Sequence, residues 1–158
     1  MNTIHHLFNQ VKTIVKVYEK HTELTGENFN IFRIMNMERD EVNTHSAIIA
    51  ELLNPKGSHG LGCKPLELFI KNTISEDSNF SFDCGSAYCH KELYIGKIND
   101  DKTEGGRVDI IVKDRNNEVI VIENKIDALE QENQLSRYKT KYPKSNLFFL
   151  TPNGDESK

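Results

Sequence analysis

The sequence predicts an α/β fold, a mixed four-stranded β-sheet flanked by helices, with a helical extension at the N-terminus. Two observations support this class. Short runs rich in β-branched and aromatic residues, typical of strands, occur at residues 90–97, 107–113, 119–125 and 145–150. Longer segments with apolar residues three and four positions apart, the spacing of an amphipathic helix, precede these runs and separate the last two.

The N-terminal extension is expected to comprise residues 1–39, ahead of a core domain in residues 40–158. Residues 1–20 have the periodicity of one amphipathic helix, and residues 21–30 are polar and predict a loop. Residues 31–37 are apolar but short, so they fit either a second helix or an extended segment. The apolar face of the first helix consists of Ile4, Leu7, Phe8, Val11, Ile14, Val15 and Tyr18.

The core is expected to begin with a helix over residues 40–54, which ends there because the residue before Pro55 disfavours helical backbone. A glycine-containing loop, a helix over residues 66–74 and a polar surface loop over residues 76–88 follow. The predicted inner face of the first core helix is Val42, His45, Ile49, Leu52 and Leu53.

Residues 107–125 predict a β-hairpin with a polar turn at residues 114–118, where asparagine tolerates the left-handed backbone of tight turns. If the strands pair about Asn116, opposed residues have numbers that sum to 232, and Asp109 lies opposite Glu123. Opposed Cβ atoms are about 5 Å apart. A two-residue turn would instead give a sum of 233, and a bulge would then be needed to bring the same charges together.

Three charged residues of this hairpin, Asp109, Glu123 and Lys125, are predicted to cluster, since side chains two positions apart on a strand share a face. Two adjacent carboxylates raise each other's pKa unless a cation neutralises them, and Mg²⁺ prefers oxygen ligands of this kind. Lys125 could then orient a metal-bound water or neutralise charge on a phosphate. The structural alternative is an ion pair between Glu123 and Lys125, with Asp109 paired to Arg107 or Arg115.

The sequence resembles the PD-(D/E)XK nuclease superfamily at three places. Asp109 followed by Glu123-Asn124-Lys125 resembles its core signature, and Gln134 with Tyr138, one helical turn apart, resembles the Gln-x-x-x-Tyr motif of its RecB-type exonuclease branch. Residues 41–60 resemble the N-terminal signature of an uncharacterised subfamily. The resemblance implies a restriction-endonuclease-like core. Because that subfamily commonly continues further, the chain is expected to be either a short member or one truncated at its C-terminus.

The resemblance also implies a metal site for Mg²⁺ or Mn²⁺. Asp109 and Glu123 would be ligands, the backbone carbonyl of Asn124 would complete the oxygen shell, and a helix before the hairpin would lend a further acid. The candidate for that acid is Glu41, with Glu51 in reserve; the alternative for Glu41 is a helix-terminal acid favoured by the macrodipole. Glu92 is a weaker candidate for an extra ligand.

Other residues take supporting roles on the same resemblance. Lys125 would orient the attacking water, and Gln134 and Tyr138 would position the metal site and the DNA backbone. His45 and His59 are either structural residues or accessory groups that bind a phosphate oxygen or transfer a proton.

The implied activity is metal-dependent hydrolysis of DNA phosphodiester bonds, in defence or repair. Endonuclease or exonuclease action, and DNA or RNA as substrate, stay open at this point. Cutting both strands of a duplex would favour a homodimer. The alternative function is a catalytically inactive nuclease-fold module that binds nucleic acid or a protein partner.

Charge and composition constrain these expectations. The formal net charge of −4 is unusual for a protein that binds phosphate backbones. A basic segment offsets it locally: Arg137, Lys139 and Lys141 either contact the substrate backbone or form a solvated helix face. No apolar run reaches the length of a membrane span. Three cysteines at spacings that match no familiar structural zinc site favour a reducing cytoplasm.

Overall fold

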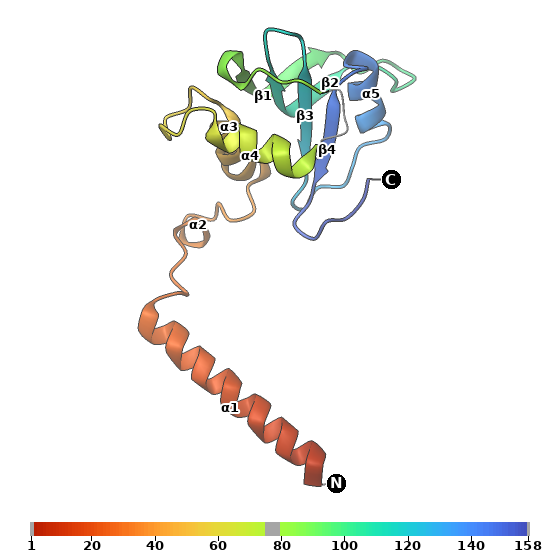
Figure 1. Cartoon of the computed structure of the whole chain (residues 1–158). Coiled ribbons are helices and arrows are strands. Elements are labelled where there is room, and N and C mark those ends of the chain that lie inside the picture. Colours follow the sequence, from red (N-terminus) through yellow and green to blue (C-terminus); the bar gives the residue numbers. More distant parts are fainter. Residues whose placement is uncertain (1, 75–79, 158) are drawn as a thin grey trace. The chain divides into compact units, whose positions relative to one another are not determined.

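The computed structural model describes residues 2–74 and 80–157, so residues 76–79 of the expected surface loop lie outside the described part (Figure 1). The chain forms two compact units, residues 1–38 and residues 39–158. No helix in the described ranges is long and apolar enough to cross a membrane.

The first unit contains α1 (Asn2–Thr25) and the short α2 (Ile31–Ile34). The predicted amphipathic helix is therefore present and extends further toward its C-terminus. The short apolar segment after it is helical because Asn30 caps α2, accepting hydrogen bonds from the backbone N–H groups of Phe32 and Arg33. All seven predicted apolar positions of α1 are exposed.

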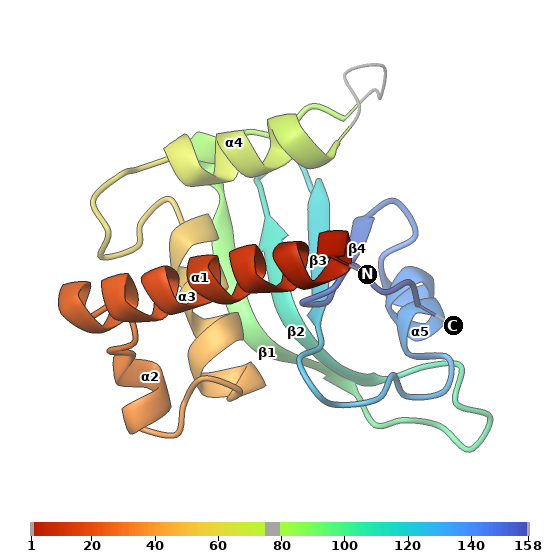
Figure 2. The same cartoon turned by 90° about the horizontal axis from the view of Figure 1, so that it is seen from below.

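The second unit holds one four-stranded sheet in the order β1 (Tyr88–Gly96), β2 (Gly106–Lys113), β3 (Val119–Asn124) and β4 (Asn146–Leu150), and Figure 2 shows the strands side by side in this order. The first three strands are antiparallel and β4 runs parallel to β3. The predicted mixed sheet flanked by helices is confirmed.

Two apolar clusters cover the two faces of this sheet. Residues of α3 (Ala47–Leu53) and α4 (Lys64–Thr73) pack on one face, against β2 and β3. Residues of α5 (Gln134–Lys141) pack on the other. The central strands β2 and β3 are buried on both faces, which explains why their apolar runs do not alternate with polar residues, whereas β1 and β4 are only partly buried.

The hairpin of β2 and β3 has the predicted register. Ile110 pairs with Ile122 and Ile111 with Val121, so opposed residue numbers sum to 232 and the two-residue turn is excluded. The buried carboxylate of Asp114 organises the turn, accepting from the N–H groups of Asn116 and Glu118 at 2.8 and 2.9 Å. Asn117 takes the left-handed conformation, with φ 63°.

Both ladders of β2 are interrupted at Asp109. The β2–β3 pairs end at Ile110 with Ile122. On the other side, β1 pairs Lys91 with Ile110 and Leu93 with Val108, and between them Glu92 has a φ of 57°, which is uncommon for glutamate. Such irregularities re-aim side chains. Here the Asp109 carboxylate, beyond the last ladder pair, accepts a hydrogen bond from the backbone N–H of Asn124.

The first core helix differs from the prediction in its first six residues. Residues Glu41–Ser46 form a π-helical turn, η1, before α3 continues as an α-helix. The wider turn rotates the helix, so the buried residues are Thr44, Ser46, Ala50 and Leu53. Of the predicted inner face only Leu53 is fully buried, and Leu52 is exposed.

Gly105 and Gly106 are required by the connection from β1 to β2. Gly105 has φ +83°, and a Cβ there would overlap the carbonyl oxygen of Lys97. Gly106 has φ +124° and lies against the side chains of Arg137 and Tyr138. The two glycines therefore permit the connection between β1 and β2, and they allow side chains of α5 to pack closely against its backbone.

Candidate active site

The end of β3 brings two of the predicted residues together. The carboxylate of Glu123 is fully buried and its Oε1 forms an ion pair with the Nζ of Lys125. The side chain of Lys125 is only 10% exposed. Its charge is therefore held close to the carboxylate with little access to water.

The Lys125 ammonium also faces the other predicted acids. Its Nζ lies 3.5 Å from Glu41 Oε1 and 3.8 Å from Asp109 Oδ2. Asp109 is fixed by the backbone N–H of Asn124, which donates to Oδ2 at 2.8 Å. Asp109, Glu123 and Glu41 thus surround one ammonium group, and we call these four residues the carboxylate–lysine cluster.

Glu41 reaches the cluster because of how η1 begins. Asp40 caps this turn, its side chain accepting from the N–H of Asn43 at 2.9 Å, and Glu41 is the first residue inside it. The second carboxylate oxygen of Glu41 accepts from the N–H of Ile126 at 2.9 Å. The reserve candidate, Glu51, instead bonds to the backbone N–H of Ser58 in its own loop.

Burial and mutual repulsion perturb the acids of the cluster. Burial, then the charge of Asp109, raises the pKa of Glu123 to about 7, although Lys125 opposes the shift. Burial also raises the pKa of Asp109 above its usual value. Burial alone would lower the pKa of Lys125, but its hydrogen bond to Glu123 and the charges of the three acids outweigh that effect, so the net shift is upward.

The oxygen atoms of the cluster have the chemistry of a site for a hard divalent cation. Glu123 Oε2 is buried and has no hydrogen-bond partner among the described residues, so it is available as a ligand. In the described ranges, no three His, Cys, Asp or Glu side chains are already gathered closely enough to hold a metal ion. The donor types fit, and the Lys125 ammonium on Oε1 would compete with a bound ion for the negative charge of Glu123.

Helix α5, on the face of the sheet opposite α3 and α4, contacts the cluster directly. The side-chain amide of Gln134 donates to Glu123 Oε1 at 2.6 Å and to the Tyr138 hydroxyl at 2.9 Å. Tyr138, also fully buried, donates its own proton to the carbonyl of Arg107 in β2. Gln134 and Tyr138 therefore link Glu123 to the strand that bears Asp109.

The prediction that Arg137 contacts substrate is contradicted by its burial, with an exposed fraction of 2%. Its guanidinium donates to the carbonyls of Gly105 and Glu132 and to the side-chain oxygen of Gln131. All three acceptors belong to loops that flank α5. Arg137 is therefore a structural residue that fixes α5 to the β1–β2 connection.

The remaining predicted residues lie apart from these contacts. Lys139 is exposed but donates to the carbonyl of Ser145, whereas Lys141 lines a surface pocket of about 280 Å³ together with Lys97. Both ring nitrogens of His59 bond within its own loop, to the carbonyl of Asn54 and the N–H of Leu61. His45 is half-buried in η1.

Sequence reasoning missed one buried contact next to the cluster. Ser46, which lies within the 41–60 signature, is fully buried, and its hydroxyl accepts a hydrogen bond at 3.0 Å from the side-chain amide of Asn124. The π-helical turn directs Ser46 inward. The sequence signal for this contact is Asn124, the polar middle residue of the Glu-x-Lys motif, whose side chain needs a hydrogen-bond partner if it is buried.

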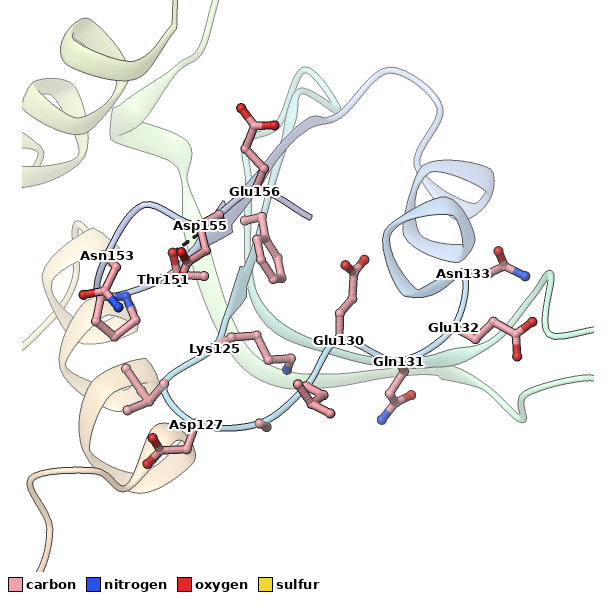
Figure 3. Close-up of a pocket in the computed structure, with 15 residues that line it drawn as sticks. Lys125, Asp127, Glu130, Gln131, Glu132, Asn133, Thr151, Asn153, Asp155 and Glu156 are labelled. Carbon is pink, nitrogen blue, oxygen red and sulfur yellow. Dashed lines mark hydrogen bonds between the residues drawn. The ribbon is translucent and has the colours of Figure 1, made fainter. Parts of the chain in front are cut away.

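A pocket of about 690 Å³ opens beside the cluster, between residues 126–133 and residues 149–156, and Figure 3 shows Lys125 on its wall. Among the described residues, Lys125 is the only basic one that lines this pocket, and the acidic ones are Asp127, Glu130, Glu132, Asp155 and Glu156. Asp127 pairs with Arg39 and Glu132 with Lys102. The approach to Lys125 is thus acidic, which opposes entry of a polyanion unless cations are bound.

Comparison with known proteins gives one family. A family model described as PD-(D/E)XK nuclease superfamily matches residues 29–151, which is most of the chain and includes the whole cluster. Neither the curated proteins nor the solved structures contain a significant match.

Proposed function

The chain belongs to the PD-(D/E)XK nuclease superfamily, and on that premise we propose that it is a metal-dependent nuclease that hydrolyses phosphodiester bonds in DNA. Its mixed sheet is the restriction-endonuclease-like core of that superfamily, whose members are generally hydrolytic nucleases. The observation that carries the proposal is the buried cluster of Asp109, Glu123 and Lys125, which includes an unpaired carboxylate oxygen. Buried charges without a role are costly.

In this proposal Asp109, Glu123, the carbonyl of Asn124 and Glu41 hold Mg²⁺ or Mn²⁺. Such an ion would polarise the scissile phosphate and lower the pKa of a water molecule. The unpaired Oε2 of Glu123 and the closeness of Asp109 and Glu41 to one cationic group support this assignment. Burial and the charge of Asp109 raise the pKa of Glu123 to about 7, and a divalent ion bound at Oε2 would oppose both effects.

Lys125, Gln134 and Tyr138 would have the remaining roles at this site. Lys125, released from Glu123, would orient the attacking water and neutralise charge that develops on the phosphate. Gln134 holds Oε1 of Glu123, which leaves Oε2 as the free ligand atom. Tyr138 holds Gln134 and the backbone of β2 in turn. His45 and His59 remain proposed as accessory groups only, since His59 is engaged in its loop.

For the substrate backbone we propose Lys141, and Lys139 beside it on α5. Lys141 and Lys97 line one pocket, and neither ammonium has an ionic partner among the described residues. By contrast, Lys139 would first have to release the carbonyl of Ser145. The acidic groove beside Lys125 implies that DNA binds the active centre only after divalent ions are bound.

The oligomeric state, the compartment and the biological role are also proposals. A homodimer would place two sites on the two strands of a duplex. The cysteines Cys63, Cys84 and Cys89 are free thiols, which suits a reducing cytoplasm. Roles in defence or in repair both fit a nuclease of this kind.

The test is cleavage of supercoiled plasmid, linear double-stranded DNA, single-stranded DNA and RNA of matched sequence, each with Mg²⁺, Mn²⁺ or EDTA. We expect cutting of DNA with either metal and none with EDTA, and nicked circles would identify an endonuclease. Lys125→Ala should be inactive, with Lys71→Ala on the exposed face of α4 as the control for loss of a charge. Metal-independent cutting, or equal activity in Lys125→Ala, would contradict the proposal. DNA binding without any cutting would favour the inactive binding module.

A further inference from the structure

The middle residue of the Glu-x-Lys motif, Asn124, connects the two segments that carry the proposed metal ligands. Its backbone N–H donates to Asp109 Oδ2 at 2.8 Å. Its side-chain amide points the other way, to Ser46 Oγ at 3.0 Å and more distantly to the carbonyl of Glu41 at 3.5 Å. One residue therefore contacts both the strand of Asp109 and the turn of Glu41.

The contact with Ser46 is built into the interior of the fold. Asn124 has an exposed fraction of 1% and Ser46 of 0%, and the two lie 78 positions apart in the sequence. Buried polar groups are normally paired because leaving one unpaired costs its full desolvation. This hydrogen bond therefore fixes where the end of η1 lies against the end of β3.

The position of η1 determines that of the Glu41 carboxylate. Glu41 is the first residue of this turn and Ser46 the last. The Glu41 side chain reaches Lys125 and the N–H of Ile126, so a shift of the turn would draw it away from the cluster. Divalent magnesium and manganese sites tolerate little displacement of a ligand, and partners behind the ligands commonly change metal affinity by about 10- to 100-fold.

We propose that Ser46 is a positioning residue for the metal site. Through its hydrogen bond with the side chain of Asn124, it holds η1 so that Glu41 faces Asp109 and Glu123. The inference rests on the proposed function in one respect, that a divalent ion binds the cluster. It assigns the polar side chain of Asn124 a role separate from that of its backbone carbonyl.

The test is Mn²⁺ binding to metal-free protein in the absence of DNA, measured by isothermal titration calorimetry. Wild type is compared with Ser46→Ala, Asn124→Ala and the double variant. We expect each single variant to raise the Kd for Mn²⁺ by about tenfold. Because both act through one hydrogen bond, the double variant should be no weaker than either single variant.

A control separates positioning from general loss of stability. Leu53→Ala removes a buried side chain from α3, the continuation of η1, without touching the cluster, and it should leave the Kd unchanged. Ser46→Cys is slightly larger than serine and offers the Asn124 amide only a weak sulfur acceptor, so it replaces Ser46→Ala if that variant does not fold at the titration temperature.

The outcomes distinguish this inference from the proposed function. If wild type binds Mn²⁺ and the Ser46 variant binds equally well, or if Leu53→Ala weakens binding as much, the positioning role is wrong while the metal site stands. If wild type binds no Mn²⁺, the proposed function fails and this inference fails with it.

Discussion

Replacing Lys125 by methionine should destabilise the protein far more at pH 8 than at pH 5.5. The substitution keeps most of the side-chain volume and removes the cation that faces Asp109, Glu123 and Glu41. Removing one partner of a buried ion pair typically costs about 3–5 kcal/mol, because the remaining charge is left uncompensated. We therefore expect a loss of about 3 kcal/mol in the free energy of unfolding at pH 8, at the lower end of that range.

The pH dependence follows from the pKa of Glu123. With Lys125 present this pKa is already raised to about 7, and without the cation it must rise further above the value in the unfolded chain. Wild-type Glu123 is itself protonated as the pH falls through about 7, but the folded variant holds the proton over more of the range from pH 8 to 5.5, and the unfolded chain binds almost none. The stability of the variant therefore increases more steeply than that of wild type as the pH falls, and the loss at pH 5.5 should be about half of that at pH 8.

Urea denaturation followed by far-UV circular dichroism measures both values, in metal-free buffer. Lys71→Met is the matched control, since Lys71 is an exposed lysine on α4 outside the cluster. A loss of the same size at both pH values, or one no larger than that of the control, would refute the role of Lys125 as the internal counter-ion.

Four further predictions concern metal binding, its pH dependence, the scaffold and the DNA contact. Mn²⁺ should raise the melting temperature of wild type but not of Asp109→Ala, because the ion binds only the folded cluster. Scanning fluorimetry measures both melting temperatures, and an equal rise in the variant would contradict the prediction. The Kd for Mn²⁺ should rise as the pH falls below 7, since Glu123 must lose its proton to bind the ion. Calorimetric titrations that give the same Kd at pH 6 and pH 8 would count against this prediction. Arg137→Ala should cost about 2 kcal/mol in urea unfolding by leaving buried acceptors without donors. Lys141→Ala should keep its stability and weaken DNA binding in fluorescence anisotropy. A Lys141→Ala variant that binds DNA as tightly as wild type would contradict Lys141 as a substrate contact.

The hairpin of β2 and β3 could be predicted from sequence because local chemistry determines it. Asparagines permit the turn and β-branched residues fill both strands, so the register follows from the turn centre. Continued by one residue, that register predicts Asp109 opposite Glu123, although the ladder itself ends at Ile110 with Ile122. The mixed character of the sheet was predicted as well, and the parallel pairing of β4 with β3 accounts for it.

Features that depend on tertiary packing could not be predicted as well from the sequence. A π-helical turn has no marked sequence pattern, so the inward positions of Thr44 and Ser46 were missed. Arg137 was assigned to the surface because its neighbours are basic, although it shares a helix face with Gln134 and Tyr138 at spacings of three and four. That spacing was a usable signal for its burial.

The position of the Lys125 ammonium was outside what periodicity can show. Alternation placed Lys125 on the same face as Glu123, but whether an ammonium or a metal ion balances the acids depends on distances across three segments of the chain. The structure shows the ammonium among the carboxylates, and this gives the proposed metal site a competitor within the protein.

The measurement that tests the central claim most directly is Mn²⁺ binding detected by electron paramagnetic resonance at pH 8, in the absence of DNA. The free-ion signal should fall as wild type is added, and it should not fall with Asp109→Asn, which keeps the shape of the side chain and removes its charge. Glu123→Gln should behave in the same way as Asp109→Asn. A wild-type protein that leaves the free-ion signal unchanged, or variants that bind Mn²⁺ as tightly as wild type, would contradict a metal site formed by Asp109 and Glu123.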